Sequence, residues 1–132
     1  MRSVLADTGP LYALVDPDDQ LHQRAISEAR RLAAEGRTLV VTFPTLLESQ
    51  SLVLRRLGIK TARTWLAQMT AGAGLLNPHR DDYLAACRRV GAYADQAITL
   101  ADALVAVLAD QLHLSVWTFD HHFDVMGVAV WR

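Results

Sequence analysis

The sequence predicts one α/β domain spanning residues 1–132, with helices covering both faces of a mostly parallel sheet of about five strands, a three-layer α/β/α arrangement. Short apolar runs rich in Val and Leu alternate with longer segments of helical periodicity. No linker, repeat or low-complexity tract divides the chain. At 132 residues and 52% hydrophobic composition, the chain is long enough to bury a core without disulfides or zinc.

The apolar runs are short enough to be strands, and several of them suit burial on both faces of a parallel sheet. The predicted strands are Ser3–Ala6, Leu39–Thr42, Leu75–Asn77, Ser115–Phe119 and Val128–Trp131.

The segments between the strands have the spacing of helices, and two of them end at a glycine that suits a helix stop. The predicted helices run from Leu21 to a stop at Gly36, from Leu46 to a stop at Gly58, and over Thr61–Ala71, Arg80–Ala94 and Leu100–Leu112. The last helix is apolar almost all round and must be central. Strands that alternate with helices imply right-handed crossovers, and therefore a parallel sheet.

Composition excludes several classes of protein. Cys87 is the only cysteine, which rules out a disulfide framework, fits a reducing compartment, and leads us to expect a buried, inert thiol. No basic segment precedes an apolar stretch at the N-terminus, and Asp102 interrupts the longest apolar run, so we expect a cytoplasmic protein without a membrane span. The net charge of −1 excludes a broad basic field, so any nucleic-acid binding must be local.

Acidic residues follow the predicted strands. Asp7 comes directly after the first strand and Asp120 directly after the fourth, while Glu48 is expected in the first turn of the helix after the second strand. Because all strand-to-helix junctions of a parallel sheet lie at the same edge, we expect these three side chains to converge. Each acid has a simpler explanation as a helix or turn cap, Thr45-x-x-Glu48 being a capping-box pattern.

Asp102 is the most informative acid, because it is the only polar residue between Leu100 and Ala109 in a helix that must be buried. Thr99-x-x-Asp102 also matches a capping box. Caps gathered at one edge would repel by roughly 3–4 kcal/mol per pair at 4–5 Å, so something positive should lie among them. A set of oxygen ligands without cysteine selects Mg²⁺ or Mn²⁺, and such ions suit phosphodiester chemistry.

The chain resembles the PIN-domain family along nearly its whole length. The resemblance lies in Asp7 of the opening Asp-Thr segment, Glu48 early in the third helix, Asp102 in Leu-Ala-Asp-Ala-Leu, and Asp120 in Thr-Phe-Asp-x-x-Phe. It is strongest to VapC toxins, which implies a metal-dependent endoribonuclease held silent by a VapB-like antitoxin. The resemblance further implies that Asp7, Asp102 and Asp120 hold the metal, that Glu48 completes the pocket, that RNA is the substrate, and that the chain forms a homodimer.

Four further residues are candidates for supporting positions around the metal. Thr8 and Thr118 can bond neighbouring carboxylates or a phosphate, or else stabilise turns. Asp95 falls where many relatives have an acid, and Asp124 lies one short turn beyond Asp120.

The His121-His122 pair beside Asp120 suggests a transition metal. Adjacent histidines in a short turn are expected to diverge, however, and the other ligands are all oxygen, so we favour a hard ion over zinc.

Two other functions compete with a ribonuclease. Asp-Thr-Gly is loosely similar to the nucleophile motif of haloacid-dehalogenase-like phosphatases, but Gly9 stands where the second aspartate belongs and no lysine falls where one is expected. The second alternative is a catalytically inactive PIN-like module that binds RNA or docks a partner. The complete acidic set argues against this loss of activity. The phosphatase alternative is distinguished by its substrates, because a phosphatase, unlike a nuclease, would turn over small phosphate esters.

Overall fold

The computed structural model describes residues 2–132, so Met1, the first residue of the expected domain, lies outside the described residues. The elements follow in the order β1 (Ser3–Ala6), α1 (Thr8–Val15), α2 (His22–Ala34), β2 (Thr38–Thr42), α3 (Phe43–Leu57), α4 (Ile59–Gly72), β3 (Gly74–Leu76), α5 (Arg80–Gly91), α6 (Leu100–Leu112), β4 (Ser115–Trp117) and α7 (His122–Val125). Within residues 2–132, none of the helices has the length and apolar character needed to cross a lipid bilayer.

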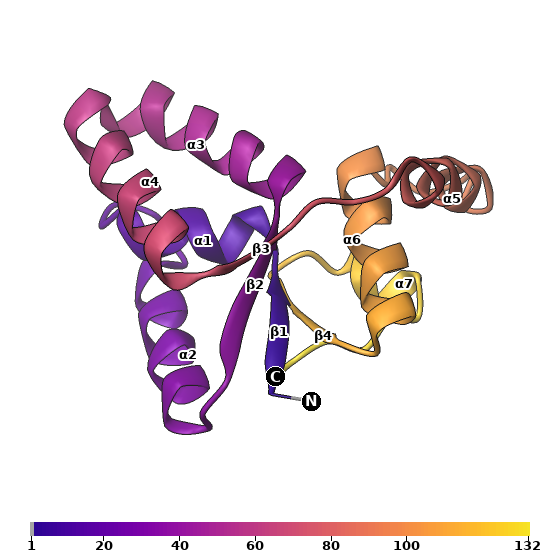
Figure 1. The fold of residues 1–132 in the computed structure, drawn as a ribbon, viewed down its shortest axis with the longest axis horizontal. Coiled ribbons are helices and arrows are strands. Elements are labelled where there is room, and N and C mark those ends of the chain that lie inside the picture. The colour runs from indigo at the N-terminus through magenta and orange to yellow at the C-terminus, as the bar shows by residue number, and fades with distance from the viewer. Residues whose placement is uncertain (1) are drawn as a thin grey trace.

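The sheet is parallel and has the strand order β3-β2-β1-β4. Figure 1 shows α1 to α4 on one side of this sheet and α5, α6 and α7 on the other. The chain builds the sheet outward from β1 to β3, then returns to add β4 on the opposite side of β1. This reversal places a topological switch point between β1 and β4, where open α/β sheets form their ligand sites at the carboxyl ends of the strands.

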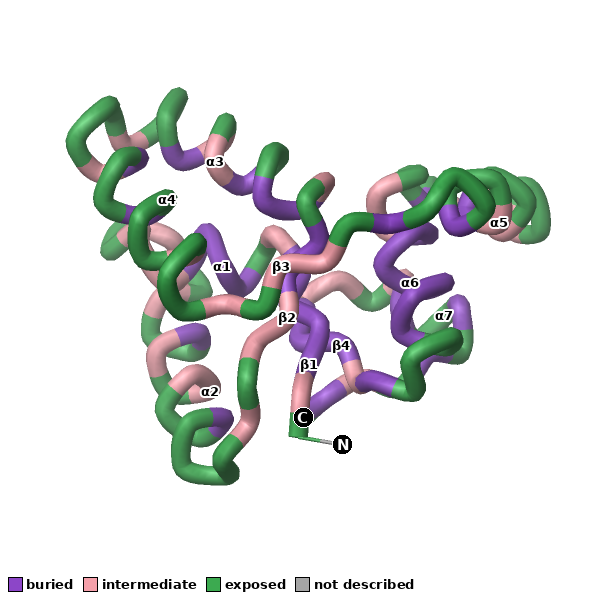
Figure 2. Tube along the Cα trace, in the orientation of Figure 1, coloured by how far each residue is buried: buried purple, intermediate pink, exposed green. Residues whose placement is uncertain are grey.

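Two apolar cores lie on opposite faces of the sheet, and β1 supplies both because its side chains alternate. Leu5 packs into the core built around α6, and Val4 and Ala6 pack into the core shared with α1 to α4. Seven consecutive residues of α6, from Ala103 to Ala109, are buried, which confirms that this helix is central. Figure 2 shows the contrast with α4 and α5, whose outer faces are exposed.

The fifth predicted strand, Val128–Trp131, is wrong as a strand. In the described residues this segment makes one isolated parallel pairing, between Val130 and Val116. Two backbone hydrogen bonds hold it, from Val116 to the carbonyl of Ala129 and from Trp131 to the carbonyl of Val116, both 2.9 Å. The segment touches the edge strand β4 at one point, and the sheet therefore has four strands in residues 2–132.

The helix after β2 begins earlier than predicted. Thr42 ends β2 and caps α3, accepting a hydrogen bond of 3.2 Å from the backbone N–H of Thr45. Strand and helix are therefore joined without a loop, and Thr45 is not the cap. Glu48 consequently lies in the second turn of α3, not the first. At the other end Gly58 terminates α3 with a positive φ of 89° and leads directly into α4.

Two helices were not expected. The Asp7-Thr8-Gly9-Pro10 segment looks like a turn in sequence, but α1 begins at Thr8, because proline is tolerated in the first helical turn, where its missing N–H would lack a partner anyway. The second unexpected helix, α7, is only four residues long. Cys87 lies on α5 and is exposed, so the expectation that it is buried is wrong.

Candidate functional site

Asp7 lies at the switch point, directly after β1. Its backbone N–H donates to the carbonyl of Trp117 at 2.9 Å, which extends the pairing of β1 with β4 by one residue. The side chain is buried and accepts a 2.8 Å hydrogen bond at Oδ2 from Thr118 Oγ1. Thr118 Oγ1 in turn accepts 2.9 Å from the N–H of Asp120. One threonine hydroxyl therefore fixes two of the predicted acids relative to each other.

The electrostatics show that Asp7 is in acidic surroundings. Burial raises the pKa of its carboxyl, and the negative charges of Asp120 and Glu48 raise it further. The Thr118 hydroxyl and the backbone N–H of Thr8 lower that pKa in part, by donating to the charged form. Three of the four predicted acids therefore interact at one place.

Asp102 joins this group from the opposite side of the sheet. It lies in the first turn of α6, where its backbone N–H donates to Thr99 Oγ1 at 3.1 Å, so Thr99 is the helix cap as its spacing suggested. Burial, followed by the charges of Asp7 and Asp120, raises the pKa of the Asp102 carboxyl to about 6. Its protonated form also donates a hydrogen bond to Asp120, which contributes to the rise in pKa. A capping role for Thr99 thus coexists with a carboxylate held in the acidic group.

Glu48 forms the exposed outer edge of the group. Thr8 Oγ1 donates to Glu48 Oε1 at 2.7 Å, and Ser49 Oγ donates to Thr8 Oγ1 at 3.3 Å. Thr8 therefore donates a hydrogen bond to a neighbouring carboxylate, which is one of the two roles expected for it. Ser49, which is fully buried, was missed by sequence reasoning, because nothing in its spacing distinguishes it from an ordinary helix residue.

The structure thus brings Asp7, Glu48, Asp102 and Asp120 together at one edge of the sheet, and we call these four residues the acidic group. No lysine or arginine of residues 2–132 forms an ion pair with Asp7, Glu48 or Asp102. The only basic side chains paired with the acidic group in the described residues are the two histidines beside Asp120, and four carboxylates are a donor set that fits a hard divalent cation.

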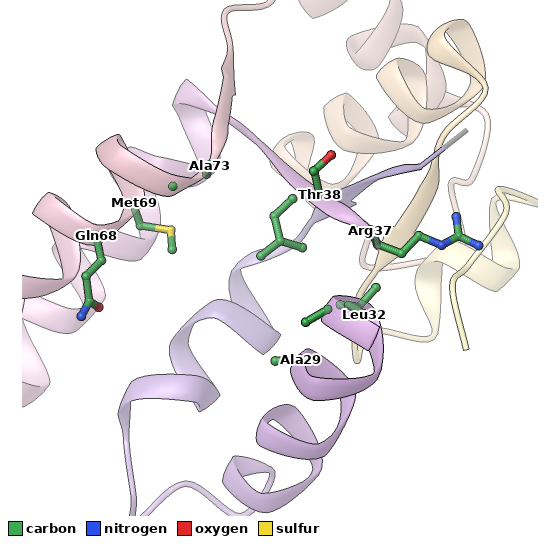
Figure 3. A pocket seen from close by; sticks show the side chains of 10 residues that line it. Ala29, Leu32, Arg37, Thr38, Gln68, Met69 and Ala73 are labelled. Carbon is green, nitrogen blue, oxygen red and sulfur yellow. The ribbon is translucent and has the colours of Figure 1, made fainter. Parts of the chain in front are cut away.

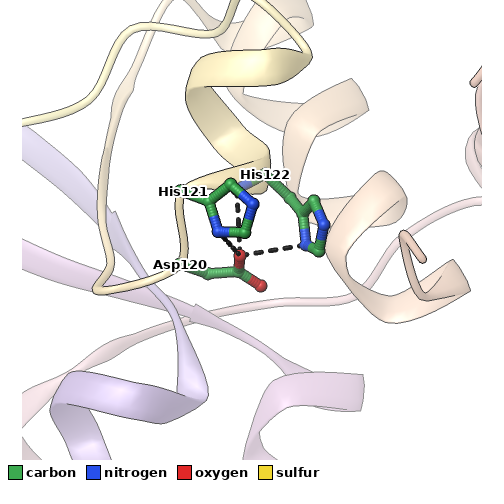
Figure 4. A group of neighbouring side chains, drawn as sticks. All are labelled: Asp120, His121 and His122. Carbon is green, nitrogen blue, oxygen red and sulfur yellow. Dashed lines mark hydrogen bonds and ion pairs between the residues drawn. The ribbon is translucent and has the colours of Figure 1, made fainter. Parts of the chain in front are cut away.

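The two histidines after Asp120 do not diverge, and that expectation is wrong. Their ring centroids lie 4.3 Å apart, and both rings stand beside the same carboxylate (Figure 4). His122 Nδ1 lies 3.0 Å from Asp120 Oδ1, and His121 Nδ1 lies 3.8 Å from it. The one-turn helix α7 starts here, with His121 as its N-cap residue.

Two candidate supporting residues stay outside the acidic group. Asp95 is exposed in the segment between α5 and α6, and it is not among the groups that shift the pKa of Asp7 or Asp102. Asp124 accepts a 2.6 Å hydrogen bond from Arg132 Nη2, and this contact lowers the pKa of its carboxyl. It shares with Asp120 and His121 the lining of a small hollow of about 150 Å³, so it is a neighbour of the acidic group and not a member.

A larger cavity than this hollow lies elsewhere in the described residues. It has a volume of about 370 Å³ and lies between α2, β2 and α4, lined mainly by small and apolar side chains such as Leu32, Leu39 and Met69 (Figure 3). The residues that line this cavity include no carboxylate, histidine or thiol, so none of the predicted site residues lies in it.

Comparison with known proteins gives a consistent result. A family model described as the PIN domain matches residues 4–129. Ribonuclease VapC26 of Mycobacterium tuberculosis is 32% identical over 126 residues, which span 93% of this chain and 91% of that protein. Among solved structures, M. tuberculosis VapC20, described as a sarcin-ricin loop cleaving toxin, superposes with a TM-score of 0.84 at 20% identity, covering 98% of each chain. FitAcB from Neisseria gonorrhoeae gives a TM-score of 0.69 at 19% identity, over 98% of this chain and 96% of that chain.

A third solved structure is VapBC2 from Rickettsia felis bound to a DNA fragment from their promoter. It has a TM-score of 0.74 at 12% identity, over 98% of this chain and 97% of that chain. At these identities the structural likenesses establish the fold alone.

Proposed function

The chain belongs to the PIN-domain family, and from that premise we propose that it is a metal-dependent endoribonuclease and the toxin of a type II toxin–antitoxin pair. The observation that carries the proposal is the acidic group, in which four acids from distant parts of the chain meet and no lysine or arginine of the described residues pairs with Asp7, Glu48 or Asp102. The related VapC26 is named a ribonuclease, which supports RNA as the substrate.

Asp7, Asp102 and Asp120 would hold the ion, which we take to be Mg²⁺ or Mn²⁺, with Glu48 completing the pocket directly or through water. The raised pKa values of Asp7 and Asp102 support this assignment, because they arise from burial and from mutual repulsion, and a divalent cation offsets both by favouring the charged carboxylates. When bound, the ion supplies an activated water and stabilises the charge that develops on the phosphorane.

Glu48 and Thr118 would have separate roles beside the proposed metal ligands. Glu48 is exposed at the outer edge and oriented by Thr8, so it is suited to position the attacking water or to accept its proton. Thr118 holds Asp7 in one orientation and ties it to the backbone of Asp120. Such supporting hydrogen bonds keep metal ligands in place, and losing them typically costs about 10–100-fold in metal affinity or activity.

The buried position of Asp7 restricts the substrate. An internal phosphate must reach a recessed carboxylate, which a single-stranded or looped RNA can do while its flanking bases are free to stack.

We further propose a VapB-like antitoxin whose tail crosses the active-site face, a homodimer, and a cytoplasmic location. The structural neighbours VapBC2 and FitAcB support an antitoxin partner, because the names of both describe complexes of a VapBC or FitAB kind.

The test is cleavage of RNA by the purified full chain with Mg²⁺ or Mn²⁺, alongside the variants Asp7→Asn and Asp102→Asn. Each variant should lose at least about 100-fold in rate and bind the ion weakly by calorimetry, because a neutral amide is a poor ligand for Mg²⁺. Asp81→Asn, an exposed acid on α5, is the matched control and should keep full activity. Full activity in both site variants would refute the assignment, and ion binding without any cleavage by the wild type would favour an inactive RNA-binding or docking module.

A further inference from the structure

Three consecutive side chains after β4 converge on one point in a way that the ribonuclease chemistry does not require. Asp120 Oδ1 lies 3.0 Å from His122 Nδ1 and 3.8 Å from His121 Nδ1. One ligand atom from each of the three residues lies within 4.8 Å of the others. We propose that Asp120, His121 and His122 form a second metal site, specific for a Zn²⁺-like cation, that shares Asp120 with the acidic group.

The spacing suits a tetrahedral ion. Zinc binds imidazole nitrogen and carboxylate oxygen at about 2.0–2.1 Å, so two ligand atoms on a tetrahedron lie about 3.3–3.4 Å apart. The distances from Asp120 Oδ1 to the two imidazole nitrogens, 3.0 and 3.8 Å, bracket that value. The third separation, between one nitrogen of each ring, is at most 4.8 Å, and rotation of the exposed His121 side chain can shorten it.

The chemistry of the ligands separates this site from the acidic group. Imidazole nitrogen is a ligand for Zn²⁺ and its transition-metal neighbours, whereas Mg²⁺ prefers oxygen and keeps several waters. Two nitrogens and one oxygen leave a fourth position open to water, as in sites where zinc is exchangeable or catalytic. The four acids and the Asp-His-His triplet therefore select different ions, although they share Asp120.

An ordinary ion pair explains only part of this arrangement. His122 has a side chain 16% exposed, and its backbone N–H also donates to Asp120 Oδ1 at 2.9 Å, so its position beside the carboxylate follows from the turn. No such backbone hydrogen bond to Asp120 is described for His121. Its side chain is 76% exposed and free to point into solvent, yet its ring stands beside the same oxygen (Figure 4). A cation bound at this point would stabilise both rings in these positions.

Sharing Asp120 couples the two sites. All of the histidine contacts fall on Oδ1, which leaves Oδ2 of the same carboxylate for the acidic group. A zinc ion on Oδ1 withdraws negative charge from Asp120 and weakens its hold on a hard ion at the other oxygen. By linkage, each ion lowers the affinity for the other by the same factor. This coupling rests on the proposed function of the acidic group, whereas the binding of zinc does not.

The experiment is calorimetric titration of Zn²⁺ into the metal-free full chain, repeated with saturating Mg²⁺. We expect one zinc site in the wild type, and affinity at least about 10-fold weaker in His121→Ala and in His122→Ala, because each removes one of three ligands. His113→Asn is the matched control. It removes an exposed histidine on the far end of α6, and asparagine tolerates the positive φ of 54° found there. Its zinc affinity should equal that of the wild type.

His121→Ala keeps the test decisive even if His122→Ala fails to fold, because the His121 side chain is mostly exposed. Unchanged zinc affinity in His121→Ala would overturn the proposal, since zinc would then be held by other groups. The two proposals fail separately. If the wild type binds zinc but shows no Mg²⁺-dependent RNA cleavage, the result would contradict the ribonuclease proposal and not the zinc site.

Discussion

Replacing Asp102 by asparagine should make the metal-free protein more stable near neutral pH, although changing a partly buried residue usually destabilises a protein. The reason is the acidic group itself. Burial and the charges of Asp7 and Asp120 raise the pKa of Asp102 to about 6, from an ordinary value of 3.8. The folded chain therefore binds this proton more tightly than the unfolded chain does. Stability is then highest below the ordinary pKa, falls as the pH rises from about 4 to about 6, and stays reduced above that range.

The magnitude follows from the pKa. A difference of one pKa unit corresponds to about 1.4 kcal/mol, which sets a ceiling of about 3 kcal/mol on the free energy that ionised Asp102 costs the fold. The carboxyl is only partly buried, so solvent screening reduces this to roughly 1.5 kcal/mol. Asp102 also lies at the N-terminus of α6, where losing a negative charge costs about 0.5 kcal/mol. A net stabilisation of about 1 kcal/mol remains for Asp102→Asn.

The assay is urea unfolding of the wild type and Asp102→Asn in chelator-treated buffer, from pH 4 to pH 7.5. The free energy of unfolding should fall with pH in the wild type and much less in the variant, so that the two curves separate above about pH 6. The backbone cap from Thr99 is kept in the variant, because the donor is the N–H of residue 102. A variant that is less stable than the wild type at pH 7.5 without metal would refute the view that Asp102 is held against repulsion.

Three further outcomes can be measured on the same protein. Mg²⁺ at about 100 times its dissociation constant should stabilise the wild type by about 2.7 kcal/mol in thermal or urea unfolding and should hardly affect Asp102→Asn. Thr118→Val, which removes both hydrogen bonds of that hydroxyl, should cost about 1–3 kcal/mol of stability and at least about 10-fold in RNA cleavage, whereas Thr118→Ser should keep both. Arg89→Met should lower the free energy of unfolding in urea by about 1–3 kcal/mol, because it leaves the carbonyl of Met126 without its 2.8 Å donor. Arg80→Met, on the exposed end of α5, is the control and should not lower it. RNA cleavage by the folded Arg89→Met variant should stay unchanged.

The convergence of the acidic residues could be predicted from sequence because topology alone determines it. Asp7 and Asp120 each follow a strand of a parallel sheet, and every such junction lies at the same edge. Asp102 was identified by a different signal, a lone charge in a helix that must be buried, and seven buried residues follow it in α6. Both arguments use only the order of elements and the pattern of hydrophobic residues.

The details that sequence reasoning missed depend on contacts between distant side chains or on a single backbone turn. Nothing in the chain order shows that Arg132 donates a hydrogen bond to Asp124, or that Ser49 donates one to Thr8. The position of Glu48 was wrong by one turn because β2 passes into α3 without a loop, which no composition signal marks. The direction of the His121 ring depends on a turn of four residues, too short to have a periodicity.

The different exposures of the four acids are a physical argument for their different roles. Asp7 is buried and held by a hydroxyl, so its orientation is fixed before any ligand arrives, which suits a metal ligand. Glu48 is exposed and held by one hydroxyl that is itself partly exposed, so it can move with a water or a proton at little cost. Asp120 lies between these extremes and faces histidine nitrogens at one oxygen, so it is the acid whose affinity for the proposed metal its surroundings would alter most. If the roles follow exposure in this way, calorimetry should show much weaker ion binding after Asp7→Asn, whereas Glu48→Gln should leave ion binding nearly intact and slow the chemical step.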